Sequence, residues 1–246
     1  MGEPGRWKRR VEEFVLGQIG DAPTRVLEVG CGEGELARAV ARAGHSVIAI
    51  DPRAPEGASE GASEGTPGQV VFWRVGIEGF SDPGPFDRVV AILSLHHIED
   101  LAGALDKVAG LLRAGGELVV VEFAWERIDA ATAAWVLGRL PAASPSGHTS
   151  WLERCCEGRG HKGEGESHEH AEHAEEAHFV GWAEAGFHDS LTMRGELGRR
   201  FAERHFEWVP YLYADLAEGV SEANEAAAIE LGTINATGFR YVGTVA

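Results

Sequence analysis

Apolar residues occur in short runs along the first half of the chain, and amphipathic stretches separate these runs. A short apolar run bounded by turn residues is typical of a buried strand. The pattern predicts five such strands, at Arg25–Val29, His45–Ile50, Gln69–Val75, Phe86–Leu93 and Glu117–Phe123. Helical patterns lie around them at 6–20, Glu35–Gly44 and Leu101–Leu112. This alternation indicates an α/β fold, a parallel sheet with helices on both faces.

The second half of the chain is less regular. Helical patterns occur at Ile128–Leu140, Phe179–Gly186, Phe201–Gly219 and Ser221–Gly232. Strands predicted at Phe187–Arg194 and Phe239–Val245 bring the sheet to about seven strands. We expect a single domain over residues 1–246, with its core at about 21–125, 187–194 and 236–246. A helical cap is expected over about 126–180 and 196–235.

Charge narrows the range of partners. The net charge is −17, from 39 acidic and 22 basic residues. Such a surface repels nucleic acid and anionic membranes, so we expect neither as a partner and favour a small, neutral or cationic molecule. Solubility alone would explain the same charge equally well. The chain also has no run of about 18 apolar residues, so no membrane span is expected.

The cysteines and the N-terminus bear on the compartment. Cys31 stands alone, and Cys155 and Cys156 are adjacent, so the three do not form a disulfide framework. The first twenty residues are charged throughout and lack the apolar core of a signal peptide. We therefore predict a cytoplasmic location in a reducing environment.

The stretch VLEVGCGEG, residues 26–34, reads as a buried strand that runs into a glycine loop. Its glycines are spaced G-x-G-x-G, whereas a dinucleotide fingerprint is G-x-G-x-x-G. Glu28, just before the loop, would repel a pyrophosphate and suits a ligand that carries an ammonium group. Asp51 follows the second strand, where an acid can accept hydrogen bonds from ribose hydroxyls. Dinucleotide enzymes also place an acid there, and Asp51 could instead be a cap or turn residue.

Several stretches together resemble the class I S-adenosylmethionine-dependent methyltransferases of the small-molecule type. They are VLEVGCGEG, Asp51, FDRVVAILSLHHIEDL at 86–101 and LLRAGGELVVVEF at 111–123. The resemblance covers residues 24–123. It implies a Rossmann-like, seven-stranded, mostly parallel sheet with a helical cap. It also implies direct transfer of a methyl group from S-adenosylmethionine to an O, N or C atom of a small molecule. The product cofactor would be S-adenosylhomocysteine, and no metal is expected.

The resemblance also implies which residues bind the cofactor. They are Glu28, Gly30, Cys31, Gly32, Gly34, Asp51, Pro52, Ile77, Glu78, Leu93 and Ser94. One departure concerns adenine, because Gly76 and Ile77 stand where the family often has an Asp-Ala pair. Glu78 could replace the missing carboxylate.

The candidates for catalysis and substrate binding are fewer. His96 or His97, after the fourth strand, could act as a general base, or could be a structural histidine. Glu122 and Trp125 could face the substrate mouth. Tyr211 and Tyr213 are further candidates for substrate contacts, although an aromatic residue at any of these positions is more often core.

Other possibilities remain open. Five histidines between His161 and His178 raise the question of a metal, but their irregular spacing favours an acidic lid segment. Apolar faces on the cap could serve a lid or a homodimer. Two rival functions are a non-catalytic S-adenosylmethionine-binding module and an NAD(P)-dependent oxidoreductase. Glu28 and the glycine spacing argue against the second.

Overall fold

The computed structural model describes most of the chain as two compact units. The described residues are 3–55, 66–82, 84–141, 152, 156, 186–217 and 219–245. One part, here called the sheet unit, comprises Arg9–Glu122, Leu191–Glu207 and Arg240–Ala246. The other, the helical unit, comprises Met1–Lys8, Phe123–Ser190 and Trp208–Phe239. The histidine-rich segment 161–178 lies outside the described residues.

The sheet has seven strands, as the sequence predicts. They are β1 (Arg25–Val29), β2 (Ser46–Ile50), β3 (Val70–Trp73), β4 (Phe86–Ile92), β5 (Leu112–Phe123), β6 (Ala202–Val209) and β7 (Gly238–Thr244). Their order is β3-β2-β1-β4-β5-β7-β6, and β1 to β5 pair in parallel. The adjacent strands β1 and β4 are where the strand order reverses, with β2 and β3 following on one side and β5, β7 and β6 on the other. Open α/β sheets bind ligands beyond the carboxyl ends of strands at such a switch point.

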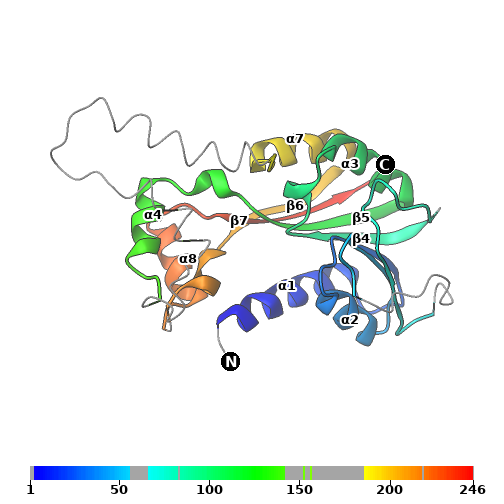
Figure 1. The fold of residues 1–246 in the computed structure, drawn as a ribbon, viewed down its shortest axis with the longest axis horizontal. Helices are drawn as coiled ribbons and strands as arrows, with labels where there is room; N and C mark the ends of the chain where they lie inside the picture. Colours follow the sequence, from blue (N-terminus) through cyan, green and yellow to red (C-terminus); the bar gives the residue numbers. More distant parts are fainter. Residues whose placement is uncertain are drawn as a thin grey trace. The chain divides into compact units, whose positions relative to one another are not determined.

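Helices cover both faces of the sheet within the sheet unit. Figure 1 shows α3 (Leu101–Leu111) and α7 (Ser190–Arg200) on one face, with α2 (Glu35–Arg42) on the other. Every residue of β2 is buried, which explains why the strand is apolar throughout and does not alternate. The fold class predicted from the sequence is therefore confirmed.

Two predictions for the second half are wrong. Phe187–Arg194 is not a strand, because α7 begins at Ser190. Met193, Leu197 and Phe201 lie four residues apart and are all buried, which is helical spacing. Phe201–Gly219 is not a helix, because β6 occupies Ala202–Val209. The sixth strand thus lies about fifteen residues later than expected, inside the range assigned to the cap.

The helical unit includes the helices α4 (Ala130–Leu137) and α8 (Glu222–Glu230), at positions that the sequence predicts. Glu225 of α8 is fully buried. Its carboxylate accepts hydrogen bonds from the backbone N–H groups of Tyr211 (2.9 Å), Leu212 (3.2 Å) and Tyr213 (2.7 Å). These donors lie at the start of the short turn η3 (Leu212–Asp215). A buried carboxylate satisfied in this way fixes the turn against the helix.

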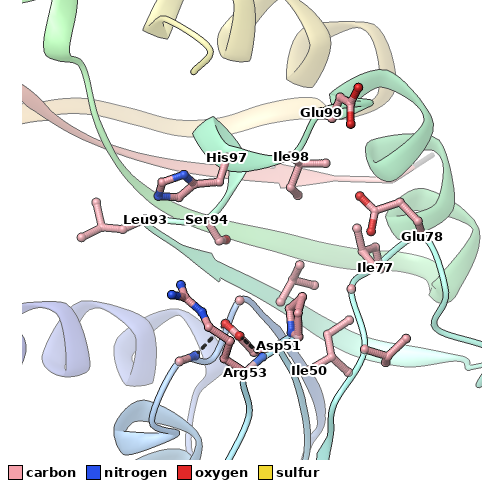
Figure 2. A pocket seen from close by; sticks show the side chains of 16 residues that line it. Ile50, Asp51, Arg53, Ile77, Glu78, Leu93, Ser94, His97, Ile98 and Glu99 are labelled. Carbon is pink, nitrogen blue, oxygen red and sulfur yellow. Dashed lines mark hydrogen bonds between the residues drawn. The ribbon is translucent and has the colours of Figure 1, made fainter. Parts of the chain in front are cut away.

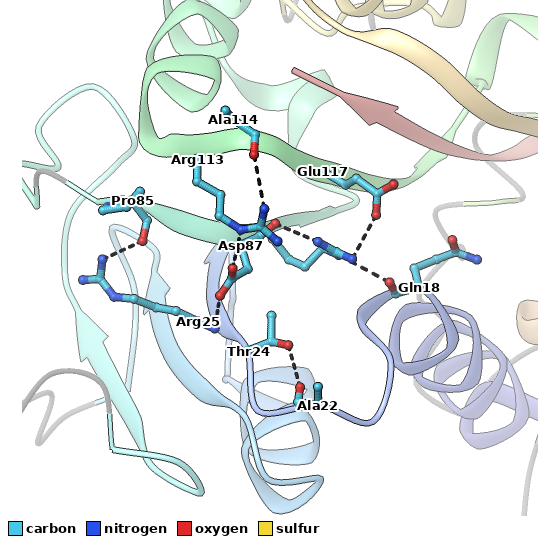
Figure 3. Close-up of polar contacts among 10 residues, drawn as sticks. Gln18, Ala22, Thr24, Arg25, Pro85, Asp87, Arg113, Ala114 and Glu117 are labelled. Atoms are coloured by element: carbon cyan, nitrogen blue, oxygen red, sulfur yellow. Dashed lines mark hydrogen bonds and ion pairs between the residues drawn. The ribbon is translucent and has the colours of Figure 1, made fainter. Parts of the chain in front are cut away.

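Ion pairs tie the amino ends of the central strands together in the sheet unit. Figure 3 shows the carboxylate of Asp87 between the backbone of Arg25 and the side chain of Arg113, while the guanidinium of Arg25 points to the carbonyl of Pro85. The carboxylate of Asp87 accepts from the backbone N–H of Arg25 at 2.9 Å and from Nε of Arg113 at 2.5 Å. Burial raises the pKa of Asp87, but these donors outweigh it, so the pKa is lowered overall. Arg88 pairs with Glu117 at 3.1 Å, and Arg25 with the buried Asp82 at 2.8 Å.

Candidate functional site

A pocket of about 570 Å³ opens at the carboxyl ends of β1, β2 and β4 in the sheet unit. Figure 2 shows Asp51 and Arg53 approaching it from one side and the turn that carries Ser94 and His97 from another. The lining residues are Val29, Gly30, Gly32, Ile50, Asp51, Pro52, Arg53, Val75, Gly76, Ile77, Glu78, Leu93, Ser94, His97, Ile98 and Glu99. The pocket thus occupies the switch point of the sheet.

The glycine loop forms the floor of this pocket with its backbone. Gly30 has φ +78°, and a Cβ added there would lie under 3.0 Å from the side chain of Ser94. Only glycine therefore fits where the ends of β1 and β4 meet. The N–H groups of Gly30 and Cys31 donate to the carbonyl of Ile50, at 2.8 and 3.1 Å, which joins the loop to β2.

Asp51 closes the loop on the side of β2. Its Oδ2 accepts from the N–H of Gly32 at 3.0 Å, and its Oδ1 accepts from the N–H of Arg53 at 2.7 Å. Each carboxylate oxygen has two lone pairs, so both can accept a further hydrogen bond from a diol. The carboxylate is thus fixed in direction and still able to hold a ribose.

Glu28 lies behind the loop and is not a lining residue of the pocket. It is 5 % exposed, and its Oε2 has no hydrogen-bond partner among the described residues. Burial raises the pKa of Glu28 to about 8, against the hydrogen bond from the backbone of Ala37, and the charge of Asp51 raises it further. Burial likewise raises the pKa of Cys31 to about 12, so its thiol is not a nucleophile near neutral pH.

The turn after β4 brings a histidine to the pocket wall. His97 lines the pocket, whereas His96 is buried with its Nδ1 at 2.7 Å from Oε2 of Glu122. Burial lowers the pKa of His97, as do the charges of His96 and Arg53, while Glu122 acts in the opposite direction. The imidazole of His97 is therefore neutral near pH 7 and able to accept a proton.

The predicted cofactor residues separate into two groups. Gly30, Gly32, Asp51, Pro52, Ile77, Glu78, Leu93 and Ser94 line the pocket. Glu28, Cys31 and Gly34 do not. Sequence reasoning did not assign the lining residues Val29, Ile50, Arg53, Val75, Gly76, Ile98 and Glu99. Arg53 adjoins the predicted Pro52 and Glu99 lies two residues from His97, so their charges could have drawn attention.

The predicted substrate residues all lie in the helical unit. Trp125 is buried and donates from Nε1 to the carbonyl of His188 at 3.3 Å. Tyr213 is buried too. Tyr211 is half-buried, with its ring 4.7 Å from that of Phe123 and 5.6 Å from that of Trp7. Glu122 is fully buried and does not face a substrate mouth, which corrects the expectation for that residue.

Two properties of the described residues bear on metals and membranes. No cluster of three or more His, Cys, Asp or Glu side chains that could hold a metal ion occurs among them. In the same part of the chain, no helix is long and apolar enough to cross a membrane.

The fold and the pocket define a class of protein, the methyltransferases with a Rossmann-like sheet. Residues 3–209 match the family model described as a methyltransferase domain, so the chain belongs to that family. A curated relative, the ubiquinone biosynthesis O-methyltransferase of Xylella fastidiosa (strain 9a5c), is 37 % identical over 112 residues. That match covers 44 % of this chain and 45 % of the relative, so the chain matches less than half the relative's length.

Solved structures show the same fold. An S-adenosylmethionine-dependent methyltransferase from Mesorhizobium loti has a TM-score of 0.54 at 19 % identity, with 99 % of this chain and 100 % of that one covered. The N-methyltransferase NodS from Bradyrhizobium japonicum WM9, solved with S-adenosyl-L-homocysteine, has a TM-score of 0.55 at 16 % identity, covering 99 % and 88 %. At these identities the likeness concerns the fold alone.

Proposed function

We propose that this protein binds S-adenosylmethionine in the pocket of the sheet unit and uses it to methylate a small molecule. The observation that carries the proposal is the charge of the pocket wall. Asp51, Glu78 and Glu99 are acidic, and Arg53 is the one arginine or lysine among the sixteen lining residues. Excess carboxylates disfavour a pyrophosphate and favour a ligand with ammonium and sulfonium groups. Membership of the methyltransferase family supports the same cofactor.

The lining residues fit the parts of that ligand by their chemistry. Asp51 is suited to accept from both ribose hydroxyls, because its oxygens are already oriented by backbone N–H groups. Gly30 and Gly32 let a ligand approach the backbone closely. Arg53 offers a guanidinium to a carboxylate. Ile77 and Glu78 would stand near the adenine, with Glu78 as the acceptor for its amine.

The reaction needs little from the protein beyond positioning. When bound, S-adenosylmethionine supplies a methyl group whose bond to sulfur breaks as the acceptor atom bonds to the carbon, the electron pair staying on sulfur. The pocket holds the reactants in line and excludes water. His97 takes the proton that a hydroxyl acceptor loses, because its neutral imidazole lies at the wall. His96 is less suited, since its Nδ1 faces Glu122.

The acceptor we propose is a hydroxyl oxygen. Several curated relatives are named as ubiquinone biosynthesis O-methyltransferases, and a hydroxyl is an acceptor for which a neutral histidine is useful. Trp125, Tyr211 and Tyr213 stay predictions as substrate contacts. The single-domain organisation, the homodimer and the cytoplasmic location also stay predictions, and sedimentation of the purified chain would test the homodimer.

The test is a calorimetric titration with S-adenosylmethionine, S-adenosylhomocysteine and NAD⁺ in turn. We expect micromolar binding of the first two and none of NAD⁺. The protein is then incubated with S-adenosylmethionine and either catechol or benzylamine, and mass spectrometry detects a methylated product. Binding of NAD⁺ alone would overturn the cofactor. Tight binding of S-adenosylmethionine without turnover of any hydroxyl or amine would favour a non-catalytic binding module.

A further inference from the structure

The proposed function gives no role to the buried carboxyl group of Glu122. Glu122, near the end of β5, is 0 % exposed. Its Oε1 accepts from the backbone N–H groups of Ser94 at 2.8 Å and Leu95 at 2.6 Å. Its Oε2 lies 2.7 Å from Nδ1 of His96. Burial of a carboxylate is costly, so three hydrogen bonds to one turn indicate that the turn depends on it.

The sheet register explains why a residue so distant in sequence reaches this turn. Ile92 of β4 pairs with Val121 of β5, so Glu122 lies level with Leu93, where β4 ends. Leu93 has φ +50°, a left-handed conformation that is strained for a leucine. The strained residue and its neighbour Ser94 both line the pocket. The hydrogen bonds to Oε1 of Glu122 hold the backbone of Ser94 and Leu95, directly after the strained Leu93.

The second carboxylate oxygen of Glu122, Oε2, contacts one of two neighbouring histidines. A carboxylate accepts hydrogen bonds and does not donate them, so Nδ1 of His96 must carry a proton. The ring of His96 lies 4.0 Å from that of His97, centroid to centroid, with the planes tilted by 39°. His97 in turn lines the pocket. A rotation of the His96 ring would therefore displace the His97 ring.

We propose that Glu122 is a positioning residue with a separate task for each oxygen. Oε1 holds the turn that forms one wall of the cofactor pocket. Oε2 holds His96 in its Nδ1-protonated form, and so keeps the ring of His97 at the wall. The inference rests on the proposed function for its meaning, but the geometry on which it stands does not depend on any ligand.

The variant Glu122→Gln separates the two tasks. The amide oxygen of glutamine can still accept both backbone N–H groups, whereas its NH₂ group now faces Nδ1 of His96. His96 must then accept at Nδ1 and carry its proton on Nε2. Long-range ¹H–¹⁵N spectra of the histidine-labelled protein at pH 8 report the protonated nitrogen, and a His96→Gln sample assigns the signal. We expect Nδ1–H in the wild type and Nε2–H in Glu122→Gln.

The variant Glu122→Ala removes both tasks and tests the pocket wall. We expect it to bind S-adenosylhomocysteine about tenfold more weakly than the wild type. Glu122→Gln should restore the affinity to within about threefold, because Oε1 is retained. Glu117→Gln, on the same strand but paired with Arg88, is the matched control and should change neither readout.

The results that would overturn this inference differ from those that would overturn the proposed function. An Nε2–H signal for His96 in the wild type, or the same tautomer in wild type and Glu122→Gln, would overturn the inference even if Glu122→Ala failed to fold. Equal losses of affinity in Glu122→Ala and Glu122→Gln would overturn the separate task of Oε1. A wild type that binds neither S-adenosylmethionine nor S-adenosylhomocysteine would defeat the proposed function, while the tautomer would still decide the role of Oε2.

Discussion

The two ends of the central strands in the sheet unit use acidic residues in opposite ways. At the amino ends, acids pair with arginines: Asp82 with Arg25, Asp87 with Arg113, and Glu117 with Arg88. At the carboxyl ends, Asp51 and Glu122 instead receive backbone N–H groups, and one oxygen of Glu28 has no partner among the described residues. At the amino ends, arginines neutralise the acids. At the carboxyl ends, Asp51 lines the pocket, whereas Glu28 and Glu122 are buried and do not line it.

This difference shows where the fold is stabilised and where it can act. Ion pairs between partly exposed side chains contribute modestly to stability and leave nothing for a ligand to neutralise. Asp51 is held by backbone N–H groups at the pocket and keeps free lone pairs for a ligand. Groups with perturbed pKa values, such as Glu28, gather at functional sites. We therefore expect substitutions of pocket-lining residues such as Asp51 and His97 to change function, and substitutions at the amino ends to change stability.

The largest effect is expected at His97. His97→Gln should lower the rate of methyl transfer by about 100-fold, because the proton acceptor is lost. In the wild type the rate should rise with pH, with a midpoint below 6.5 because burial lowers the pKa of His97. The variant should lose this dependence. The pH dependence is measured from rates of methyl transfer across pH 5–8, with whichever of catechol or benzylamine is methylated as the acceptor. His205→Gln on β6 is the control. An unchanged rate would exclude His97 as the base.

The second-largest effect is expected at Asp51, as a loss of affinity for the cofactor. Asp51→Ala should weaken binding of S-adenosylhomocysteine by about 1–3 kcal/mol, or roughly 5- to 150-fold, since two hydrogen bonds to ribose are lost. Calorimetry of wild type and variant gives the difference. Affinity that stays the same would remove Asp51 from the ribose site.

Glu28 should affect stability in a way that depends on pH. Its pKa is raised to about 8 in the folded chain, so the folded state binds its proton more tightly than the unfolded state. This stabilisation is complete below the unfolded value of 4.5 and is lost as pH rises through about 8. Glu28→Gln should therefore be more stable than the wild type by about 1–3 kcal/mol at pH 9, and no more stable at pH 4. Urea unfolding at both pH values measures this. A gain that is equal at both would contradict the titration of Glu28.

The smallest effect is expected at the amino ends. Asp87→Asn should cost about 1–2 kcal/mol in the free energy of unfolding, because the ion pair with Arg113 is lost. The pKa of Asp87 is lowered in the fold, so its contribution is present above the unfolded value of 3.8 and is lost as pH falls through the lower folded value. Affinity for S-adenosylhomocysteine should stay the same. A loss of affinity equal to that of Asp51→Ala would end the distinction between the two ends.

Much of the sheet could be predicted because its strands are buried on both faces. A continuous apolar run such as Ser46–Ile50 can be recognised from the sequence as a buried strand. The strand β6 was missed because Ala202–Val209 is nowhere buried and its charged residues interrupt the apolar pattern, as is common in edge strands. The helix α7 was missed because two glycines, Gly195 and Gly198, weaken a pattern that Met193 and Leu197 otherwise support.

The site was predictable where one local stretch forms it. The glycine loop and Asp51 are identified by spacing, and both lie at the pocket. Glu122 was not assigned to the turn, because its partners Ser94 and Leu95 are 28 and 27 residues away in sequence. Only the register of β5 against β4 brings them together. Contacts that depend on strand register cannot be read from spacing alone.

Glu225 in the helical unit has a consequence for amide hydrogen exchange. The N–H groups of Tyr211, Leu212 and Tyr213 are bound by a side chain of α8 and not by a neighbouring strand. Their exchange with solvent deuterium therefore requires that α8 separate from the turn. These three amides would report the opening of a helix to which they do not belong, and their protection would measure how firmly α8 is attached.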